Sequence, residues 1–277
     1  MDVRVGCTFS YVAEVPTAAI MQVEPRLDRA GGEHGSDALV REEWSIDPML
    51  VTHPYRDGFG NPCRRLTLPV GPSVLGYDAV VRVSGEPDDM DTTAEEIAPD
   101  RMPDDVLAFT VPSRFCLSDL LGDVAWAEFG GCTPGYARVQ AVCDYVHDRL
   151  RFDYGASSPF ATAVDVYQAR AGVCRDFAHL AISLCRALNI PARYAFGYIP
   201  DFGPNVVRDG APMDFCAWME VFLGGRWWTF DPRNNVRRTG RVLVGLGRDA
   251  VDVAMVTAFG GPQLTSMVVR AEVQQAP

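Results

Sequence analysis

The chain of 277 residues is long enough for one large domain or two modest ones, and its 48% hydrophobic residues allow a buried core. Its net charge of -11 argues against nucleic-acid binding, which needs a basic surface to neutralise phosphates. No uncharged apolar run approaches the roughly 18 residues of a membrane-spanning helix, and the first twelve residues lack the pattern of a secretory signal.

The cysteines do not follow the spacing of a metal site or of a disulfide framework. There are eight of them: Cys7, Cys63, Cys116, Cys132, Cys143, Cys174, Cys185 and Cys216. They are scattered without any C-x-x-C pair, which favours reduced thiols and therefore the cytoplasm. Most of them are expected to be small buried hydrophobic residues.

The N-terminal part of the chain is rich in predicted strands. Alternating apolar runs occur at residues 3–15, 64–70 and 77–85, with Gly and Pro between them. The stretch 84–105 is acidic, contains several prolines and has no apolar periodicity, which is typical of a linker on the surface. We therefore predict a β-rich domain over residues 1–100 and a second domain over residues 101–277.

The second domain is predicted to contain helices followed by a sheet. Apolar residues recur at helical spacing in three segments, residues 118–130, 135–152 and 173–190. Three strands are expected after them, at residues 193–200, 216–223 and 226–232. Helices followed by an antiparallel sheet indicate an α+β fold.

The last two of these strands form a predicted hairpin with a chemically unusual face. If residues 224–225 make a two-residue turn, Trp218 lies opposite Asp231 and Cys216 is the diagonal neighbour of Asp231. Diagonal neighbours on one face are about 7 Å apart, within reach of functional side chains. The core-facing set comprises Ala217, Met219, Val221, Trp228 and Phe230. The opposite face presents Cys216, Trp218, Glu220, Thr229 and Asp231, as an active-site hairpin would.

Cys174 is the strongest candidate for a reactive thiol. It stands at or just inside the N-terminus of the helix predicted at 173–190, where free N–H groups and the helix dipole lower a thiol pKa. A backbone N–H there can also contribute to an oxyanion hole. The alternative is a small residue at a tight helix start. His179 is turned by about 140° from Cys174 around the helix, so it is a poor base for that thiol.

These segments resemble the bacterial transglutaminase-like family of the papain-like superfamily. The resemblance rests on "GVCRDFAHLAISLCRALNIPARY" and "MDFCAWMEVFLGGRWWTFDPRNN", and "YRDGFGNPCRRLTLPVG" is similar to the family's N-terminal β domain. It implies an α+β core in which a nucleophile-bearing helix packs on an antiparallel sheet. It also implies that Cys174 is the nucleophile and Asp231 the orienting acid of a triad.

Cys216 departs from the family pattern. The residue before Ala-Trp in this motif is the catalytic histidine of the family, and here it is a cysteine. The histidine takes the proton from the nucleophile and returns it to the leaving group. Ordinary transglutaminase or peptidase activity is therefore not expected. The chain's four histidines fall at other places, none of them on a strand beside Cys174: His34, His53, His147 and His179.

Several functions fit this altered site. The first is a cysteine enzyme with a Cys-Cys-Asp site, in which Cys174 attacks an acyl substrate and Cys216 acts as acid/base or second thiol. Such a site suits acyl transfer, condensation or hydrolysis of a small-molecule or peptidyl thioester, ester or amide, and needs no cofactor. The alternatives are an inactive binding protein, a redox pair of Cys174 and Cys216, a metal site that adds Asp231, or an engineered His→Cys variant.

A substrate cleft is expected between the 173–190 helix and the hairpin. Trp218 and the loop at 198–213, which begins with Tyr198, are predicted to line it because this loop is long and rich in Gly and Pro. A tolerated surface insertion would have the same composition.

Overall fold

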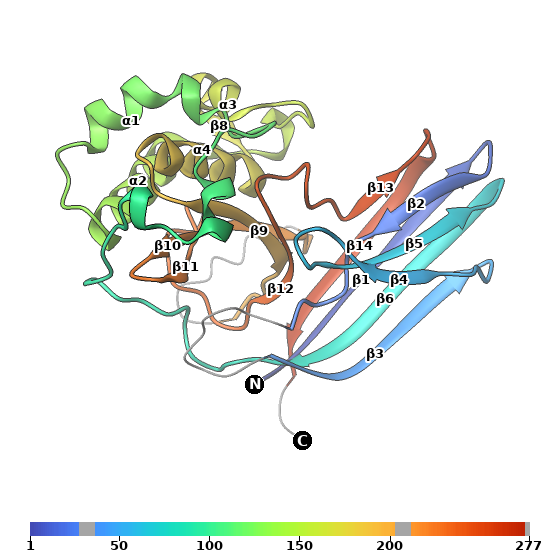
Figure 1. Ribbon diagram of the computed structural model, residues 1–277. Helices are drawn as coiled ribbons and strands as arrows, with labels where there is room; N and C mark the ends of the chain where they lie inside the picture. The colour runs from blue at the N-terminus through green and yellow to red at the C-terminus, as the bar shows by residue number, and fades with distance from the viewer. Residues whose placement is uncertain (28–36, 203–211, 275–277) are drawn as a thin grey trace.

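The computed structural model describes residues 1–27, 37–202 and 212–274, which form two units side by side (Figure 1). One unit carries all the α-helices of the described residues around a sheet, and the other consists of strands. The α+β class predicted from the sequence is confirmed.

The β-rich unit contains two four-stranded sheets whose strand pairs are all antiparallel. The first has the order β14-β1-β6-β3 and the second β13-β2-β5-β4. Their bounds are β1 (Asp2–Ala13), β2 (Thr17–Met21), β3 (Ala38–Asp47), β4 (His53–Arg56), β5 (Pro62–Leu68), β6 (Gly71–Arg82), β13 (Val256–Ala258) and β14 (Gln263–Val273). Alternate side chains of β1 are buried between the sheets, as a two-residue period requires.

The segment predicted as the second domain contains two strands that pair with the N-terminal sheets. Strand β14 pairs with β1 over nearly its whole length, and β13 pairs with β2. Residues 256–273 therefore complete the N-terminal sheets, although the prediction placed them in the domain 101–277. The reason is that a strand pattern reveals a strand but not its partner, and the default expectation is pairing with a sequence neighbour.

The second unit is built around helix α4 (Cys174–Ala187) and an antiparallel sheet of order β11-β10-β9-β12. The strands are β9 (Ala192–Tyr198), β10 (Cys216–Leu223), β11 (Arg226–Phe230) and β12 (Val242–Gly247). Helices α1 (Gly122–Phe129), α2 (Tyr136–Arg149) and α3 (Ala163–Ala169) pack around α4. Helix α4 is buried from Asp176 to Arg186 because the sheet and the other helices cover it on all sides.

Short elements connect these parts. They are the parallel pair β7 (Arg151–Phe152) and β8 (Ala171–Gly172) and four 3-10 turns, η1 (Pro99–Arg101), η2 (Asp104–Phe109), η3 (Ser118–Leu120) and η4 (Tyr154–Ala156). Helix α3 has a capping box at Thr162, a signal that the sequence prediction overlooked. No helix among the described residues is long and apolar enough to cross a membrane.

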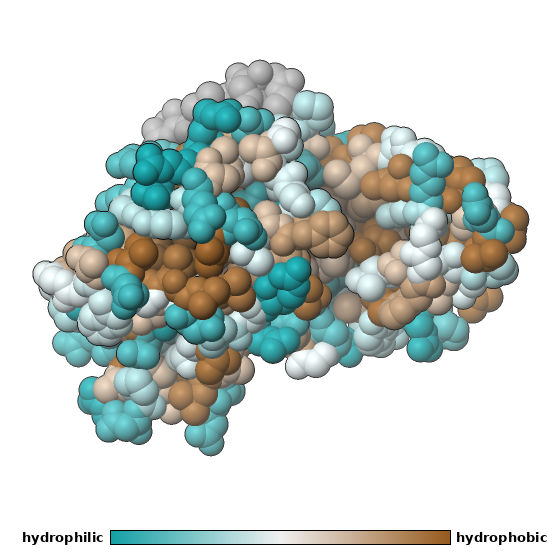
Figure 2. Space-filling model, turned by 90° about the horizontal axis from the view of Figure 1, so that it is seen from above, coloured by the Kyte–Doolittle hydropathy of each residue, from teal (hydrophilic) through white to brown (hydrophobic). Residues whose placement is uncertain are grey.

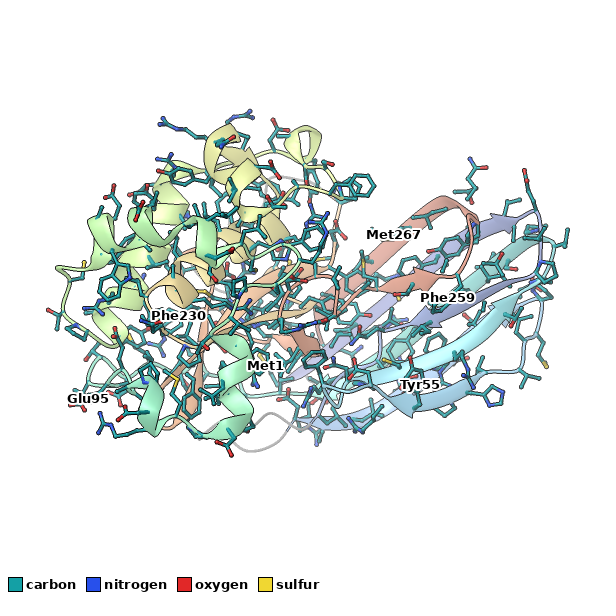
Figure 3. The ribbon with its side chains drawn as sticks, turned by 45° about the horizontal axis from the view of Figure 1, so that its top comes forward. Met1, Tyr55, Glu95, Phe230, Phe259 and Met267 are labelled. Carbon is teal, nitrogen blue, oxygen red and sulfur yellow. The ribbon has the colours of Figure 1, made fainter. Side chains whose placement is uncertain are left out.

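The acidic stretch 84–105 connects the two units and is largely exposed, as its composition predicts, but it is also fixed to the helical unit. It runs along the helical unit, where Glu95 is labelled in Figure 3, and the Glu95 carbonyl accepts a hydrogen bond from the Gly224 N–H at 2.9 Å. The Glu96 carboxylate forms an ion pair of 2.9 Å with the nearly buried Arg138 of α2. Its acidic side chains thus bind arginines of the second unit, which a composition argument cannot show.

The two units share one hydrophobic core. The rings of Phe9 in β1 and Phe215 before β10 lie 6.4 Å apart, and Tyr198 of β9 donates a hydrogen bond to the Val23 carbonyl at 3.0 Å. The surface seen from above mixes hydrophilic and hydrophobic residues over both units (Figure 2). The sheet that carries the candidate site therefore packs against the β-rich unit.

Candidate active site

The hairpin has the predicted register. Residues 224–225 form the turn, both at positive φ, and the Cα pairing of β10 and β11 extends as far as Met219 opposite Phe230. One step further along the same register lie Trp218 and Asp231. The prediction that the two-residue turn brings the strand of Cys216 alongside Asp231 is confirmed.

The two faces of the hairpin divide as expected, except that both are well packed. The predicted core-facing residues are all buried in the main core: Ala217, Met219, Val221, Trp228 and Phe230. On the other face Trp218 has no exposed surface, and Cys216 packs at the edge of the small cluster that contains it. That cluster also includes Ala195, Ile199, Leu243 and Leu246.

Cys174 is the first residue of α4, and its thiol lies against the chain on both sides of Cys216. Its Sγ is 3.9 Å from the carbonyl oxygen of Phe215, and it accepts a hydrogen bond from the backbone N–H of Ala217. The Cys216 thiol lies 3.8 Å from the carbonyl oxygen of Asp214. The structure therefore brings the two predicted thiols together at one end of β10.

The expected low pKa of Cys174 is not found. Burial raises its pKa to about 11, and the Ala217 N–H and the positive charge of Arg233 offset this only in part. For Cys216, burial and the neighbouring Cys174 raise the pKa to about 12. Removal of a thiolate from water outweighs the helix dipole and the hydrogen bond here. Both thiols are therefore protonated near neutral pH.

Asp231 is buried, and its charge is neutralised by an arginine that the sequence analysis did not single out. Its Oδ2 accepts hydrogen bonds from Arg241 and from the Asn234 amide, both at 2.8 Å, and its Oδ1 accepts one from the Asn234 backbone N–H at 2.9 Å. Burial alone would raise the pKa of Asp231, but Arg241 and Asn234 outweigh it, so the pKa is lowered. Asp231 is therefore an ionised carboxylate.

Arg241 is held in turn by the acidic stretch. Its Nε lies 2.7 Å from Asp88 Oδ2, and its side chain has no exposed surface. The guanidinium carbon lies 4.9 Å from the centroid of the Trp218 ring. Asp88, Arg241 and Asp231 thus form a buried chain of charges that ends beside the two thiols. The sequence gives no signal for this chain, because Asp88 and Arg241 are 153 residues apart.

Trp218 and Tyr198 do not fit their predicted role of lining a substrate cleft. Both side chains are fully buried, and the Tyr198 hydroxyl is bonded to the Val23 carbonyl of the β-rich unit. They stabilise the sheet and have no surface to offer to a substrate. The central part of the predicted loop, residues 203–211, lies outside the described residues.

The histidines of the described residues are placed away from the strand position of Cys216. His53 is exposed on β4 of the β-rich unit. The Nδ1 of His147 in α2 lies 2.8 Å from the Arg233 carbonyl oxygen. His179 is buried in α4, and its Nε2 accepts a hydrogen bond from the Ala250 N–H; burial lowers its pKa to about 3. His34 is outside the described residues.

Three polar residues near the thiols were missed by the sequence analysis. Asp214, Arg233 and Tyr154 all interact electrostatically with Cys174, and the Arg233 guanidinium lies 3.9 Å above the ring of Phe152. A signal existed for Asp214, since it is two residues before Cys216 and an extended chain places such residues on one face.

The metal alternative is not supported. Across residues 1–27, 37–202 and 212–274, no group of three or more His, Cys, Asp or Glu side chains is arranged to hold a metal ion. Asp231, the third ligand of that alternative, directs its oxygens at Arg241 and Asn234 instead. All eight cysteines are free thiols.

Comparison with known proteins identifies the family. Residues 125–232 match the Transglutaminase-like superfamily. A solved structure of a candidate cysteine protease from Cytophaga hutchinsonii is 30% identical, with a TM-score of 0.85, covering 100% of this chain and 93% of that chain. The chain belongs to the transglutaminase-like superfamily. The matched range includes Cys174, Cys216 and Asp231, whereas Asp88 and Arg241 lie outside it.

Curated relatives of this transglutaminase-like chain come from mycobacteria. An uncharacterized protein of Mycobacterium leprae is 33% identical over 137 residues, which is 49% of each chain, so the match spans about half the length of that relative. An uncharacterized protein of Mycobacterium tuberculosis strain H37Rv is 29% identical over 232 residues, covering 77% of this chain and 74% of that protein.

Proposed function

We propose that this protein is a cysteine enzyme that transfers an acyl group from a small-molecule or peptidyl thioester, ester or amide to water or another nucleophile. The observation that supports it is the position of the Cys174 thiol. It is a partly exposed free thiol at the start of a buried helix, and it lies against the backbone that flanks Cys216. The similarity to a candidate cysteine protease agrees with this assignment.

The roles of the two thiols follow from their surroundings. Cys174 is the nucleophile, and the N–H groups at the start of α4 can stabilise the oxyanion that forms when its sulfur attacks a carbonyl. Cys216 occupies the place of the family's histidine. With a pKa of about 12 its thiol is already protonated near neutral pH and cannot act as the base, so its role is to donate a proton to leaving groups that are themselves strongly basic. Thioesters and activated esters suit the site because their leaving groups need little protonation.

The buried charges provide the frame for these thiols. Asp231 remains ionised through its ion pair with Arg241 and places a fixed negative charge beside Cys216. This charge raises the pKa of Cys216 and so keeps its thiol protonated. No step of this reaction requires a cofactor.

The test uses Cys174→Ser with a generic thioester as substrate. We expect turnover to fall by roughly 10³-fold or more, because the nucleophile is lost. Mass spectrometry of the quenched wild-type reaction should find the acyl group on Cys174. A matched control, Cys132→Ser, changes another partly exposed cysteine and should leave turnover unchanged. Full turnover by Cys174→Ser would contradict the proposal.

A second candidate is an inactive transglutaminase-like binding protein. The observation that favours it is the raised pKa of both thiols together with the absence of an imidazole at position 216. In that case the protein would bind a peptide or small molecule without forming an acyl adduct on any cysteine. Since eight unpaired cysteines are typical of a reducing compartment, we propose that either function is exercised in the cytoplasm.

A further inference from the structure

The main chain at Asp214 and Phe215 contacts both thiols. Its carbonyl oxygen lies 3.8 Å from Cys216 Sγ, and the carbonyl oxygen of the next residue, Phe215, lies 3.9 Å from Cys174 Sγ. The Asp214 carboxylate folds back onto the same short stretch, with its Oδ1 accepting a hydrogen bond from the Phe215 N–H at 2.7 Å. The carboxylate is therefore fixed to the short segment whose carbonyl oxygens contact both thiols.

Asp214 and Asp231 are two carboxylates of the same site in opposite environments. Asp231 is saturated by Arg241 and Asn234. Asp214 takes part in no ion pair among the described residues, and its side chain remains partly exposed. A carboxylate with spare acceptor capacity and access to solvent can exchange a proton, whereas a locked and paired one cannot.

Three groups from different elements interact electrostatically with the Asp214 carboxylate: Cys174 at the start of α4, Tyr154 in η4 and Arg233 after the end of β11. Cys216, at the start of β10, contacts the Asp214 carbonyl oxygen. Burial raises the pKa of Asp214, while the Phe215 N–H and the charge of Arg233 lower it by less. The proton affinity of this carboxylate is thus closer to that of a general base than an ordinary aspartate's would be.

We propose that Asp214 is the general base of the acyl transfer and takes over the proton-accepting role of the missing histidine. This inference rests on the proposed function, because it requires Cys174 to be the nucleophile. It assigns a catalytic role to a residue outside the predicted Cys-Cys-Asp set.

The proton balance is complete with the groups present. In the first half-reaction the Cys174 proton moves to the Asp214 carboxylate while the sulfur bonds to the acyl carbon. The bond to the leaving group then breaks, and the leaving group receives a proton from Asp214 or from Cys216, which Asp214 reprotonates. In the second half-reaction the incoming water or amine gives its proton to Asp214 and attacks the thioester. The departing Cys174 sulfur takes this proton back.

The test compares two properties of Asp214→Asn that should change in opposite directions. The negative charge of Asp214 raises the pKa of Cys174, so its removal should increase the thiolate fraction and the rate of Cys174 alkylation by iodoacetamide near pH 7. Acylation of Cys174 by p-nitrophenyl acetate should nevertheless slow by about 10²-fold or more, because the base is lost. The acidic limb of the wild-type pH profile of acylation should disappear as well.

Two further variants separate catalysis from structure. Asp214→Glu keeps a carboxylate and should recover part of the acylation rate. Asp148→Asn removes an exposed carboxylate of α2 and should leave both rates unchanged. If Asp214→Asn lowers alkylation and acylation together, or leaves acylation intact, the inference is overturned. If wild-type Cys174 forms no acyl adduct, the proposed function itself fails, and this outcome is visible without any Asp214 variant.

Discussion

At the scale of single residues, the surroundings of each titratable group decide what it can do. Cys174 and Cys216 are the same residue type, yet one lies at a helix start under two hydrogen-bonding backbone groups and the other lies at a strand end beside a paired carboxylate. Asp231 is fixed in its charged form by Arg241, whereas Asp214 has no such partner among the described residues. The division of labour proposed for the site follows from these differences.

The Cys216→His variant tests the place that the histidine would occupy. We expect it to raise thioester hydrolysis by about 10²-fold, a typical gain from a positioned acid/base. The physical reason is that the hairpin register already sets this position beside Asp231, whose Oδ1 accepts one hydrogen bond and has a further lone pair for an imidazole N–H. Steady-state hydrolysis of the same thioester by both proteins is the measurement.

Cys216→Ala serves as its control. It removes the proton donor without adding an imidazole and should lower the turnover of substrates with poor leaving groups more than that of activated esters. An inert Cys216→His protein together with an unaffected Cys216→Ala protein would show that position 216 takes no part in the reaction.

The sequence allowed the prediction of where Cys174 and Cys216 lie, but not of how they ionise. Helix periodicity and a Gly-Gly turn are local signals, and they placed the thiol at the first residue of α4 and gave the hairpin register. The pKa of a thiol depends on how much water surrounds it, which is a property of the packed molecule. The position of Cys174 at the helix N-terminus therefore predicted a lowered pKa, whereas burial raises it.

At the scale of elements, the acidic stretch 84–105 is held against the helical unit by ion pairs. Its carboxylates bind arginines that come from α2, from β11 and from the approach to β12. The innermost of these contacts joins Asp88 to Arg241, which in turn holds Asp231. The acidic stretch is therefore linked through Arg241 to Asp231 of the candidate site.

Asp88→Asn should weaken this coupling. We expect it to lower the free energy of unfolding by about 2 kcal/mol, because a charge-assisted hydrogen bond to a fully buried arginine is reduced to a neutral one. Chemical denaturation followed by circular dichroism measures the change. The control Asp105→Asn alters an exposed residue of the same stretch and should stay within about 0.5 kcal/mol of the wild type. Equal effects of both changes would show that the Asp88–Arg241 ion pair does not fix this stretch to the helical unit.

Composition predicted that this stretch connects the two units, but not that it forms ion pairs with the helical unit. Acidic residues, prolines and the absence of apolar periodicity are found both in solvated linkers and in segments that form ion pairs with basic residues of the same chain. Only the arginines on the other side distinguish the two, and they are distant in the sequence. The long amphipathic helices, in contrast, were predicted to within a few residues, since their signal lies in their own side chains.

At the scale of the whole molecule, β14 closes the first sheet by pairing with β1. Its inward side chains, such as Ala271 opposite Val5, belong to the core shared by both units, and Val268 on the same strand is half exposed. The fold class was predicted correctly from the family resemblance and the order of elements. The pairing of β14 with β1 was not predicted, because no local sequence pattern specifies so distant a partner.

A pair of substitutions in β14 tests its contribution to the core. Ala271→Asp buries an unpaired charge and should lower the free energy of unfolding by several kcal/mol, enough to lower the thermal midpoint markedly. Val268→Asp places the same charge on the exposed face and should cost about 1 kcal/mol or less. Thermal unfolding monitored by circular dichroism compares them. Similar effects from both would mean that β14 is not an integral part of the sheet.

The pairing of β1 with β14 also has a consequence for biosynthesis. The neighbour of β1 on one side, β14, is synthesised some 250 residues after β1, which takes roughly 10 to 50 s. During this interval one edge of β1 has no partner, and an unpaired edge is open to association with other chains. β6, which pairs with the other edge of β1, leaves only the β14 side of β1 unpaired during this interval.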